Sequence, residues 1–310
     1  MQHGARCSAA RAEAIARLKP HHSSNCPSPQ AWVHHLVMES SHVQLPTVVS
    51  FGCYAGDDLV AQMRLWSHNL SYSPSGYRDV ARQLFPGTLA RTCPQRTLET
   101  APLAKHLLTP LDARPARGLC IEPMPQNVHL LVICLQHMGY LGQAKVIPAA
   151  LSSVSGSAAF PDGEMGREDV GLEHIPRGHV IKTVEVTVTP LDALVRAEGI
   201  ERIDHLTIDT EGNDVRVLLG ALGTLASAKV RYLEFEYHQV GHWKTSSLED
   251  TIDMLDNFNF DCYWSLNGGG LRRLTGCWHA SYDERRWSNI ACINRRERAT
   301  HAHMERLAGF

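Results

Sequence analysis

The chain has 310 residues, with 30 Lys or Arg against 32 Asp or Glu, so its formal net charge is −2. This balance excludes a generally basic nucleic-acid binder, and no apolar run approaches the ~20 residues of a membrane-spanning helix. Hydrophobic residues make up 44% of the chain and charged residues 20%, which indicates a globular protein with a buried core of one or two domains.

Both ends of the chain differ from its middle. Residues 1–30 are basic, with Glu13 as their single acid, which is compatible with an organelle transit peptide and equally with an unstructured tail. We therefore predict an N-terminal tail over 1–40, a domain over 41–296 and a charged C-terminal tail over 297–310. The nine cysteines contain no CxxC pair, which favours reduced, buried thiols in an intracellular protein without a structural zinc site.

Strand-like and helix-like segments alternate between these ends. The pattern predicts strands at 45–51, 118–123, 144–151, 179–192, 203–209, 229–238, 260–266, 271–277 and 288–294. Helices are predicted at 57–66, 125–139, 191–199, 215–227 and 248–258. This order predicts an α/β fold, a Rossmann-like and mostly parallel doubly wound sheet with an antiparallel C-terminal edge.

Ligands of such a sheet bind beyond the carboxyl ends of its strands. After the first strand, Gly52, Cys53 and Gly56 form a turn that allows close backbone approach and exposes helix amides to a carboxylate or phosphate. The alternative is an ordinary strand-to-helix turn. At the tip of the second strand, Glu122 is placed to accept hydrogen bonds from two ribose hydroxyls, or else to interact with the next helix dipole.

Acidic residues also end a later strand. Asp209 and Glu211 follow the apolar run 203–208, and such a cluster is costly unless a cation, a donor or a proton compensates it. Glu211 has the alternative role of capping the next helix. In the following strand His238 shares a face with Glu234 and Glu236, which makes it a candidate general base or a hydrogen-bonded structural histidine.

These segments resemble a known family. The stretch 184–221, VEVTVTPLDALVRAEGIERIDHLTIDTEGNDVRVLLGA, is similar to the signature of FkbM-type methyltransferases, "iDllKiDvEGaE..VLkGa". Asp209, Glu211 and Gly212 match it, and Thr207 stands where the family usually has lysine. IEPMPQNVHLL (121–131), PAALSSVSGSAAF (148–160) and YLEFEYHQVGHW (232–243) also match, so the resemblance covers about 118–296, and 46–66 more thinly.

The resemblance implies a class I methyltransferase fold that uses S-adenosyl-L-methionine to methylate a hydroxyl. The implied acceptor is a small molecule, a sugar or a lipid-like compound, and not a nucleic acid. With this fold we predict that Gly52, Cys53, Gly56, Glu122, Ala150 and Ser152 bind the cofactor. We predict Asp209, Glu211 and His238 as the catalytic residues, with Asp209 and His238 near the acceptor as a base or as orienting groups. The alternative to metal-free catalysis is a divalent cation held by Asp209 with Glu236 or His238, but we assign no metal ligand.

Two departures from the family pattern leave other functions open. The first loop reads SFGCYAG where the family has "DvGAnkG", so Ser50 replaces an aspartate and Tyr54 an asparagine. This favours, as the second hypothesis, a non-catalytic binding protein with a degenerate cofactor loop. A nicotinamide-dependent oxidoreductase would need a full GxGxxG, which this loop lacks. Glu122 also follows Gly56 by 66 residues, so 67–117 is predicted to be an insertion, either a substrate lid or a tolerated surface segment.

Overall fold

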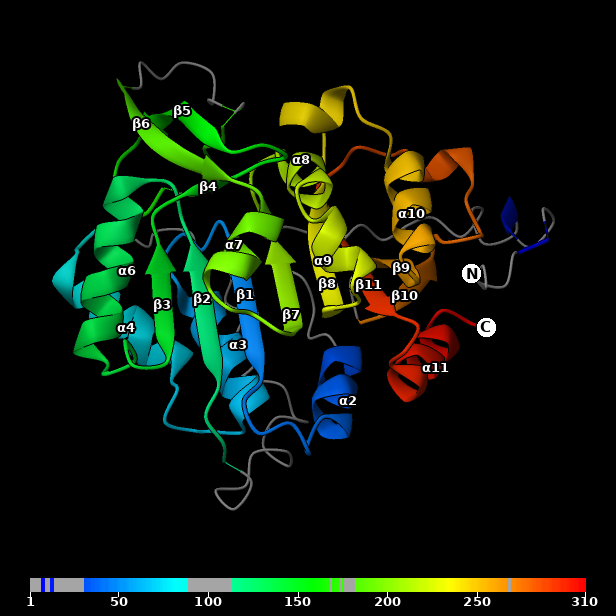
Figure 1. Ribbon diagram of the computed structural model, residues 1–310, viewed down its shortest axis with the longest axis horizontal. Coiled ribbons are helices and arrows are strands. Elements are labelled where there is room, and N and C mark those ends of the chain that lie inside the picture. Colours follow the sequence, from blue (N-terminus) through cyan, green and yellow to red (C-terminus); the bar gives the residue numbers. More distant parts are fainter. Residues whose placement is uncertain are drawn as a thin grey trace.

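A computed structural model describes residues 7–8, 12–13, 31–88, 113–167, 169–172, 174, 182–266 and 269–310. Its centre is one eight-stranded sheet in the order β10-β9-β11-β8-β7-β1-β2-β3 (Figure 1). The strands are β1 (Thr47–Phe51), β2 (Arg117–Ile121), β3 (Ala144–Ile147), β7 (Ile203–Ile208), β8 (Val230–Tyr237), β9 (Phe260–Ser265), β10 (Leu271–Arg273) and β11 (Ser288–Asn294). From β3 to β8 neighbouring strands are parallel, whereas β11 is antiparallel to β8 and β9. This confirms the predicted class I methyltransferase fold with its antiparallel C-terminal edge.

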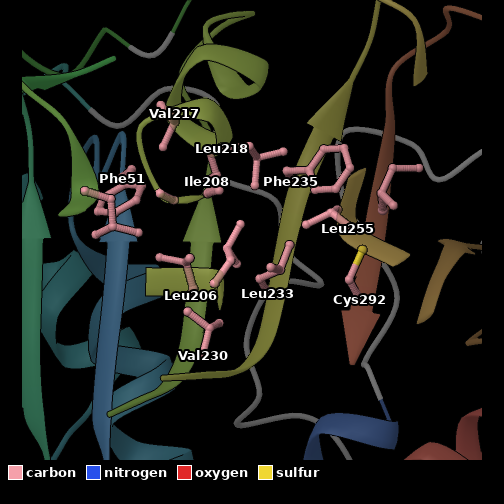
Figure 2. Close-up of a cluster of buried hydrophobic side chains, with 14 of the residues drawn as sticks. Phe51, Leu206, Ile208, Val217, Leu218, Val230, Leu233, Phe235, Leu255 and Cys292 are labelled. Carbon is pink, nitrogen blue, oxygen red and sulfur yellow. The ribbon is translucent and has the colours of Figure 1, made fainter. Parts of the chain in front are cut away.

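Helices cover both faces of the sheet. They are α2 (Ala31–Glu39), α3 (Asp57–Ser67), α4 (Pro74–Leu84), α6 (Pro125–His137), α7 (Leu191–Ala197), α8 (Asp214–Leu219), α9 (Leu222–Ala226), α10 (Leu248–Asn257) and α11 (Arg298–Leu307). One face packs against α7 to α10 around Leu206, Leu233 and Phe235 (Figure 2). The other packs against α2, α3, α4, α6 and α11. In the part of the chain that the structure describes, no helix has the length and apolarity needed to cross a bilayer.

A second, three-stranded sheet lies beyond the carboxyl ends of β1 to β3 (Figure 1). It consists of β4 (Ala150–Leu151), β6 (Lys182–Thr189) and β5 (Gly156–Asp162), in that order. The single strand predicted over 144–151 is therefore divided by a turn at Pro148, because the backbone N–H of Ala149 already bonds back to Ile147. This small sheet forms one wall of the site described below.

The terminal helices pack against the domain. The side chains of Trp32 and Leu36 in α2, and of Met304 in α11, are fully buried. The two helices also contact each other, and the hydroxyl and backbone N–H of Thr300 both bond to the carboxylate of Glu39. The tails predicted over 1–40 and 297–310 thus contain helices that belong to the packed structure.

Within the predicted insertion 67–117, residues 89–112 lie outside the described residues. The described part contains α4, which begins after Ser73, whose hydroxyl caps it by accepting from the N–H of Gly76. Tyr77 anchors the helix in the core with no exposed surface. The helix predicted over 215–227 is two helices, α8 and α9, which meet at Gly220, where a Cβ would lie 2.2 Å from the carbonyl oxygen of Ser152.

The prediction of reduced cysteines is wrong for six of the nine. Disulfides join Cys7 to Cys277, Cys53 to Cys120 and Cys262 to Cys292, whereas Cys134 is a buried thiol. Cys26 and Cys93 lie outside the described residues. The pairs escape sequence reasoning because strand pairing creates them: Cys262 and Cys292, for example, are directly opposite each other in β9 and β11.

Candidate active site

A cavity of about 420 Å³ opens at the carboxyl ends of β1, β2, β7 and β8. Residues 169–172 and the small sheet close its other sides. Its described lining comprises Ser50, Phe51, Gly52, Cys53, Tyr54, Asp57, Asp58, Ile121, Glu122, Pro123, Asn127, Ala149, Ala150, Leu151, Phe160, Arg167, Asp169, Val170, Gly171, Leu172, Thr207, Asp209, Thr210, Glu211, Asn213, Glu236 and Trp287. This is the edge at which open α/β sheets bind ligands.

The turn after β1 is held against its neighbouring strands. Gly52 has φ +70°, and a Cβ on it would lie 1.7 Å from the carbonyl oxygen of Asp209, so only glycine fits there. The Gly52 N–H donates to Ile121, and the Asp209 N–H donates to Phe51. Gly56, with φ +90°, starts α3 and is not among the described lining residues.

Glu122 is the most deeply buried acid of the predicted cofactor site. Its two carboxylate oxygens accept from the backbone N–H groups of Tyr54 and Met124, at 3.1 and 3.0 Å. Burial raises its pKa to about 7, although these hydrogen bonds oppose the rise. The Asn127 side chain also donates to this carboxylate, and because a carboxylate has about four acceptor sites, it keeps acceptor capacity for a hydroxyl donor. The residue therefore ties the loop after β1 to the tip of β2 and still faces the cavity.

The predicted catalytic acids Asp209 and Glu211 lie close to a third acid, Glu236. One carboxylate oxygen each of Asp209, Glu211 and Glu236 lies within 4.8 Å of the others. Glu211 has φ +52° and Gly212 φ +91°, so the tight turn after β7 directs Glu211 to the cavity. Glu236, at the end of β8, accepts a 2.9 Å hydrogen bond from the indole N–H of Trp287.

His238 lies behind this cluster, outside the described lining. Its side chain is fully buried and stacks on Trp287 with ring centroids 4.3 Å apart. Nδ1 accepts from the N–H of Val240 at 3.1 Å, which leaves the proton of the neutral ring on Nε2. Burial lowers its pKa to about 4, so the ring is neutral at pH 7. The predicted base is thus set back from the cavity with its basic nitrogen engaged.

The remaining predicted cofactor residues divide between two environments. Ala150 lines the cavity beside Leu151 and Phe160. Ser152 instead continues the small sheet, where its N–H bonds to Thr189, and it is not among the described lining residues. Cys53 lines the cavity with its sulfur bonded to Cys120 of β2.

Several lining residues were not predicted from the sequence. Asp57 and Asp58 occupy the first turn of α3, and a 3.1 Å ion pair joins Asp57 to Arg78 of α4. Burial raises the pKa of Asp57. The signal was available for these acids, because they directly follow Gly56. Trp287, by contrast, lies in a loop before the last strand, and no local pattern connects it with the cavity.

The cavity is strongly acidic. Seven of its described lining residues carry carboxyl groups: Asp57, Asp58, Glu122, Asp169, Asp209, Glu211 and Glu236. One is basic, Arg167, and its Nε bonds to Asp169 at 2.6 Å. Such a lining attracts a positively charged ligand and repels an anionic one. It therefore disfavours the pyrophosphate of a nicotinamide dinucleotide, the third function considered from the sequence.

Comparisons of the sequence with known proteins match methyltransferases. The methyltransferase FkbM domain model matches residues 109–262, a range that begins after the loop of Gly52 and Gly56. The 2-O-methyltransferase NoeI of Sinorhizobium fredii is 25% identical over 162 residues, which cover 48% of this chain and 65% of that protein. The chain thus spans less than two thirds of the length of this curated relative.

Solved methyltransferase structures are similar to this chain only at low identity and low TM-score. The methyltransferase FkbM of Methylobacillus flagellatus is 13% identical with a TM-score of 0.38, over 85% of this chain and 58% of that one. An O-methyltransferase from Bacillus cereus, in complex with SAH, is 10% identical with a TM-score of 0.33, over 93% and 92%. At these scores neither structure bears on the function of this chain.

Proposed function

Because this chain belongs to the FkbM methyltransferase family, we propose that it transfers a methyl group from S-adenosylmethionine to a hydroxyl of a small, uncharged acceptor such as a sugar. The observation that carries the proposal is the acidic cavity at the carboxyl ends of β1, β2, β7 and β8. S-adenosylmethionine carries positive charge on its sulfonium and ammonium groups, which suits this lining. The acceptor class is supported by a relative that is a 2-O-methyltransferase.

The residues present fit the cofactor. Glu122 would accept from a ribose hydroxyl, because its carboxylate lies at the tip of β2 and keeps acceptor capacity beside the donors Tyr54, Met124 and Asn127. Ala150 and Leu151 offer apolar surface for the adenine ring. When bound, S-adenosylmethionine supplies a methyl group on a positively charged sulfur. The chain's own contribution is to align the acceptor hydroxyl with that group, which is a large part of the catalysis of such transfers.

Asp58 offers a substitute for the aspartate that Ser50 replaces. Its carboxyl group lies in the cavity wall, in the first turn of α3. The neighbouring Asp57 is turned toward Arg78. We propose that Asp58 interacts with the ammonium group of the cofactor.

The test is calorimetric titration of S-adenosylhomocysteine, a stable probe for the cofactor, into wild type and Glu122→Gln. We expect at least a tenfold loss of affinity in the variant. The matched control is Glu198→Gln, because Glu198 is another poorly exposed carboxylate, but it pairs with Lys145 and Arg117 at the opposite edge of the sheet. Absence of binding by wild type, or equal affinity in wild type and Glu122→Gln, contradicts the proposal.

The atypical loop favours the second function, a binding protein without turnover. Ser50 removes a carboxylate from the cavity wall, and the hydroxyl of Tyr54 bonds to the backbone of Thr88 rather than facing a ligand. The proposal of catalysis and this alternative predict different probe binding for two variants, Asp58→Asn and Ser50→Asp. If Asp58 substitutes for the missing acid, Asp58→Asn weakens binding of the probe. If wild type binds none but Ser50→Asp does, the non-catalytic alternative is correct.

A further inference from the structure

The turn after β7 and the end of β8 bring three carboxyl groups to one point of the cavity. Oxygens of Asp209, Glu211 and Glu236 all lie within 4.8 Å of one another. Oxygen ligands of Mg²⁺, Mn²⁺ or Ca²⁺ are about 2.0 to 2.6 Å from the ion, so ligands of one ion lie at most roughly 4 to 5 Å apart. The three oxygens therefore fit a single hard cation.

The backbone converges at this point through two glycines. A Cβ on Gly212 would lie 2.4 Å from the carbonyl oxygen of Val240, and one on Gly241 would lie 2.7 Å from that of Gly212. The N–H of His242 completes the junction by bonding to Gly212. Contact between these turns places Glu211 opposite Glu236, although Glu211 itself has φ +52°, a conformation that is unfavourable for a residue with a side chain.

An independent observation comes from His238, which lies on the protein side of the cluster. Its side chain is fully buried, and Nε2 has no hydrogen-bond partner among the described residues. Because Nδ1 accepts from Val240, Nε2 carries a proton. Nε2 lies 3.7 Å from Oε2 of Glu236, which is too far for its N–H to donate a hydrogen bond to that oxygen. A water or hydroxyl oxygen bound to a cation on Glu236 would supply the acceptor that this buried donor lacks.

A second group of possible ligands lies elsewhere in the described structure. Asp261, His301 and Glu305 also converge, but Arg295 bonds to Asp261 at 2.9 Å, and Arg273 pairs with both acids. These arginines provide the positive charge that the group needs. It lies at the β9 and α11 side of the molecule, away from the cavity lining.

We propose that Asp209, Glu211 and Glu236 bind a divalent cation of the hard, oxygen-preferring class, Mg²⁺ or Mn²⁺, which holds oxygen atoms of the acceptor. The role of the cation in holding the acceptor rests on the proposed methyltransferase function. Cation binding itself does not, and it is measured without cofactor or acceptor.

The experiment titrates the metal-depleted full chain with Mn²⁺, followed by electron paramagnetic resonance of the free ion. We expect one Mn²⁺ per chain, displaced by excess Mg²⁺, and at least tenfold weaker binding in Glu236→Gln and Asp209→Asn. Glu211→Asn is the most informative variant, because asparagine tolerates positive φ better than glutamate does. It should lose cation affinity with an unchanged or raised midpoint of thermal unfolding. Glu198→Gln is again the matched control and should bind as wild type does.

The outcomes separate this inference from the proposed function. No Mn²⁺ binding at millimolar concentration, or equal affinity in wild type and all three variants, overturns the cation site. Binding of S-adenosylhomocysteine to a chain that binds no Mn²⁺ leaves the methyltransferase proposal intact and refutes the cation alone. Mn²⁺ binding by a chain that binds no S-adenosylhomocysteine supports the cation site and contradicts the proposed function.

Discussion

Replacement of Glu122 by glutamine removes a charge that the folded chain holds at a cost. Burial raises the pKa of this carboxyl group from 4.5 to about 7, so the group ionises more readily in the unfolded chain. Below pH 4.5 the group is protonated in both states, so no buried charge opposes folding. As the pH rises from 4.5 through 7 the free energy of unfolding falls, because the unfolded state releases its proton first.

The size of the effect follows from the pKa change. A tenfold change in an ionisation constant corresponds to about 1.4 kcal/mol, so ionised Glu122 reduces the free energy of unfolding at pH 8 by about 3 kcal/mol. Glutamine keeps the shape but loses one acceptor for the N–H of Tyr54 or Met124, which costs about 1 kcal/mol. Glu122→Gln should therefore be more stable than wild type by about 2 kcal/mol at pH 8 and less stable than wild type by about 1 kcal/mol at pH 4.

Urea unfolding at pH 4 and pH 8, followed by circular dichroism, measures this difference. Glu198→Gln should show no comparable gain at pH 8, because Glu198 is paired with Lys145 and Arg117. A stability difference between wild type and Glu122→Gln that is the same at both pH values would refute the reasoning. Cofactor affinity should change in the opposite direction: probe binding by wild type should weaken up to tenfold for each pH unit below 7.

Three further substitutions test how the cavity is built. Gly52→Ala should lower the midpoint of thermal unfolding and abolish probe binding, since its Cβ would overlap the carbonyl of Asp209; a fully stable, binding-competent variant would contradict the described turn. Arg78→Met should weaken probe binding several-fold by releasing Asp57, and unchanged affinity in calorimetry would show that α4 does not support the site. Asp192→Ala removes three hydrogen bonds to the start of α9 and should cost about 1–2 kcal/mol in urea unfolding, with probe affinity retained; loss of affinity would mean that the two regions are coupled.

Alternation of strands and helices predicted the sheet because short segments rich in apolar residues recur between the helical segments. In β7 and β8, for example, Leu206 and Leu233 are buried in the core, although polar residues such as Glu234 alternate with the apolar ones. The small sheet was not predicted, since β6 has the same alternating pattern as any half-buried strand. Only the turn at Pro148 and pairing with β5 exclude it from the main sheet.

Sequence reasoning placed residues at the cavity where they directly follow a strand. Glu122 and Asp209 come immediately after buried strands, so fold topology alone brings them to the cavity. His238 was harder to place, because its orientation depends on one hydrogen bond to Val240 and on stacking against Trp287. That tryptophan is 49 residues further along the chain, and local sequence carries no information about such a contact.

The position of β11 has a consequence for how the chain is completed during synthesis. This strand is inserted between β8 and β9, and α11, which follows it, packs on α2 from the start of the described domain. Until residues 288–307 have been made, β8 and β9 cannot pair through their shared neighbour, and both expose unpaired backbone groups. The hydrogen bond from the indole of Trp287 to Glu236 also forms only when the residue directly before β11 reaches the end of β8. A nascent chain that lacks its last strand would thus have open sheet edges and an unfinished cavity, so chaperone dependence and loss of ligand binding should appear together in truncations before residue 288.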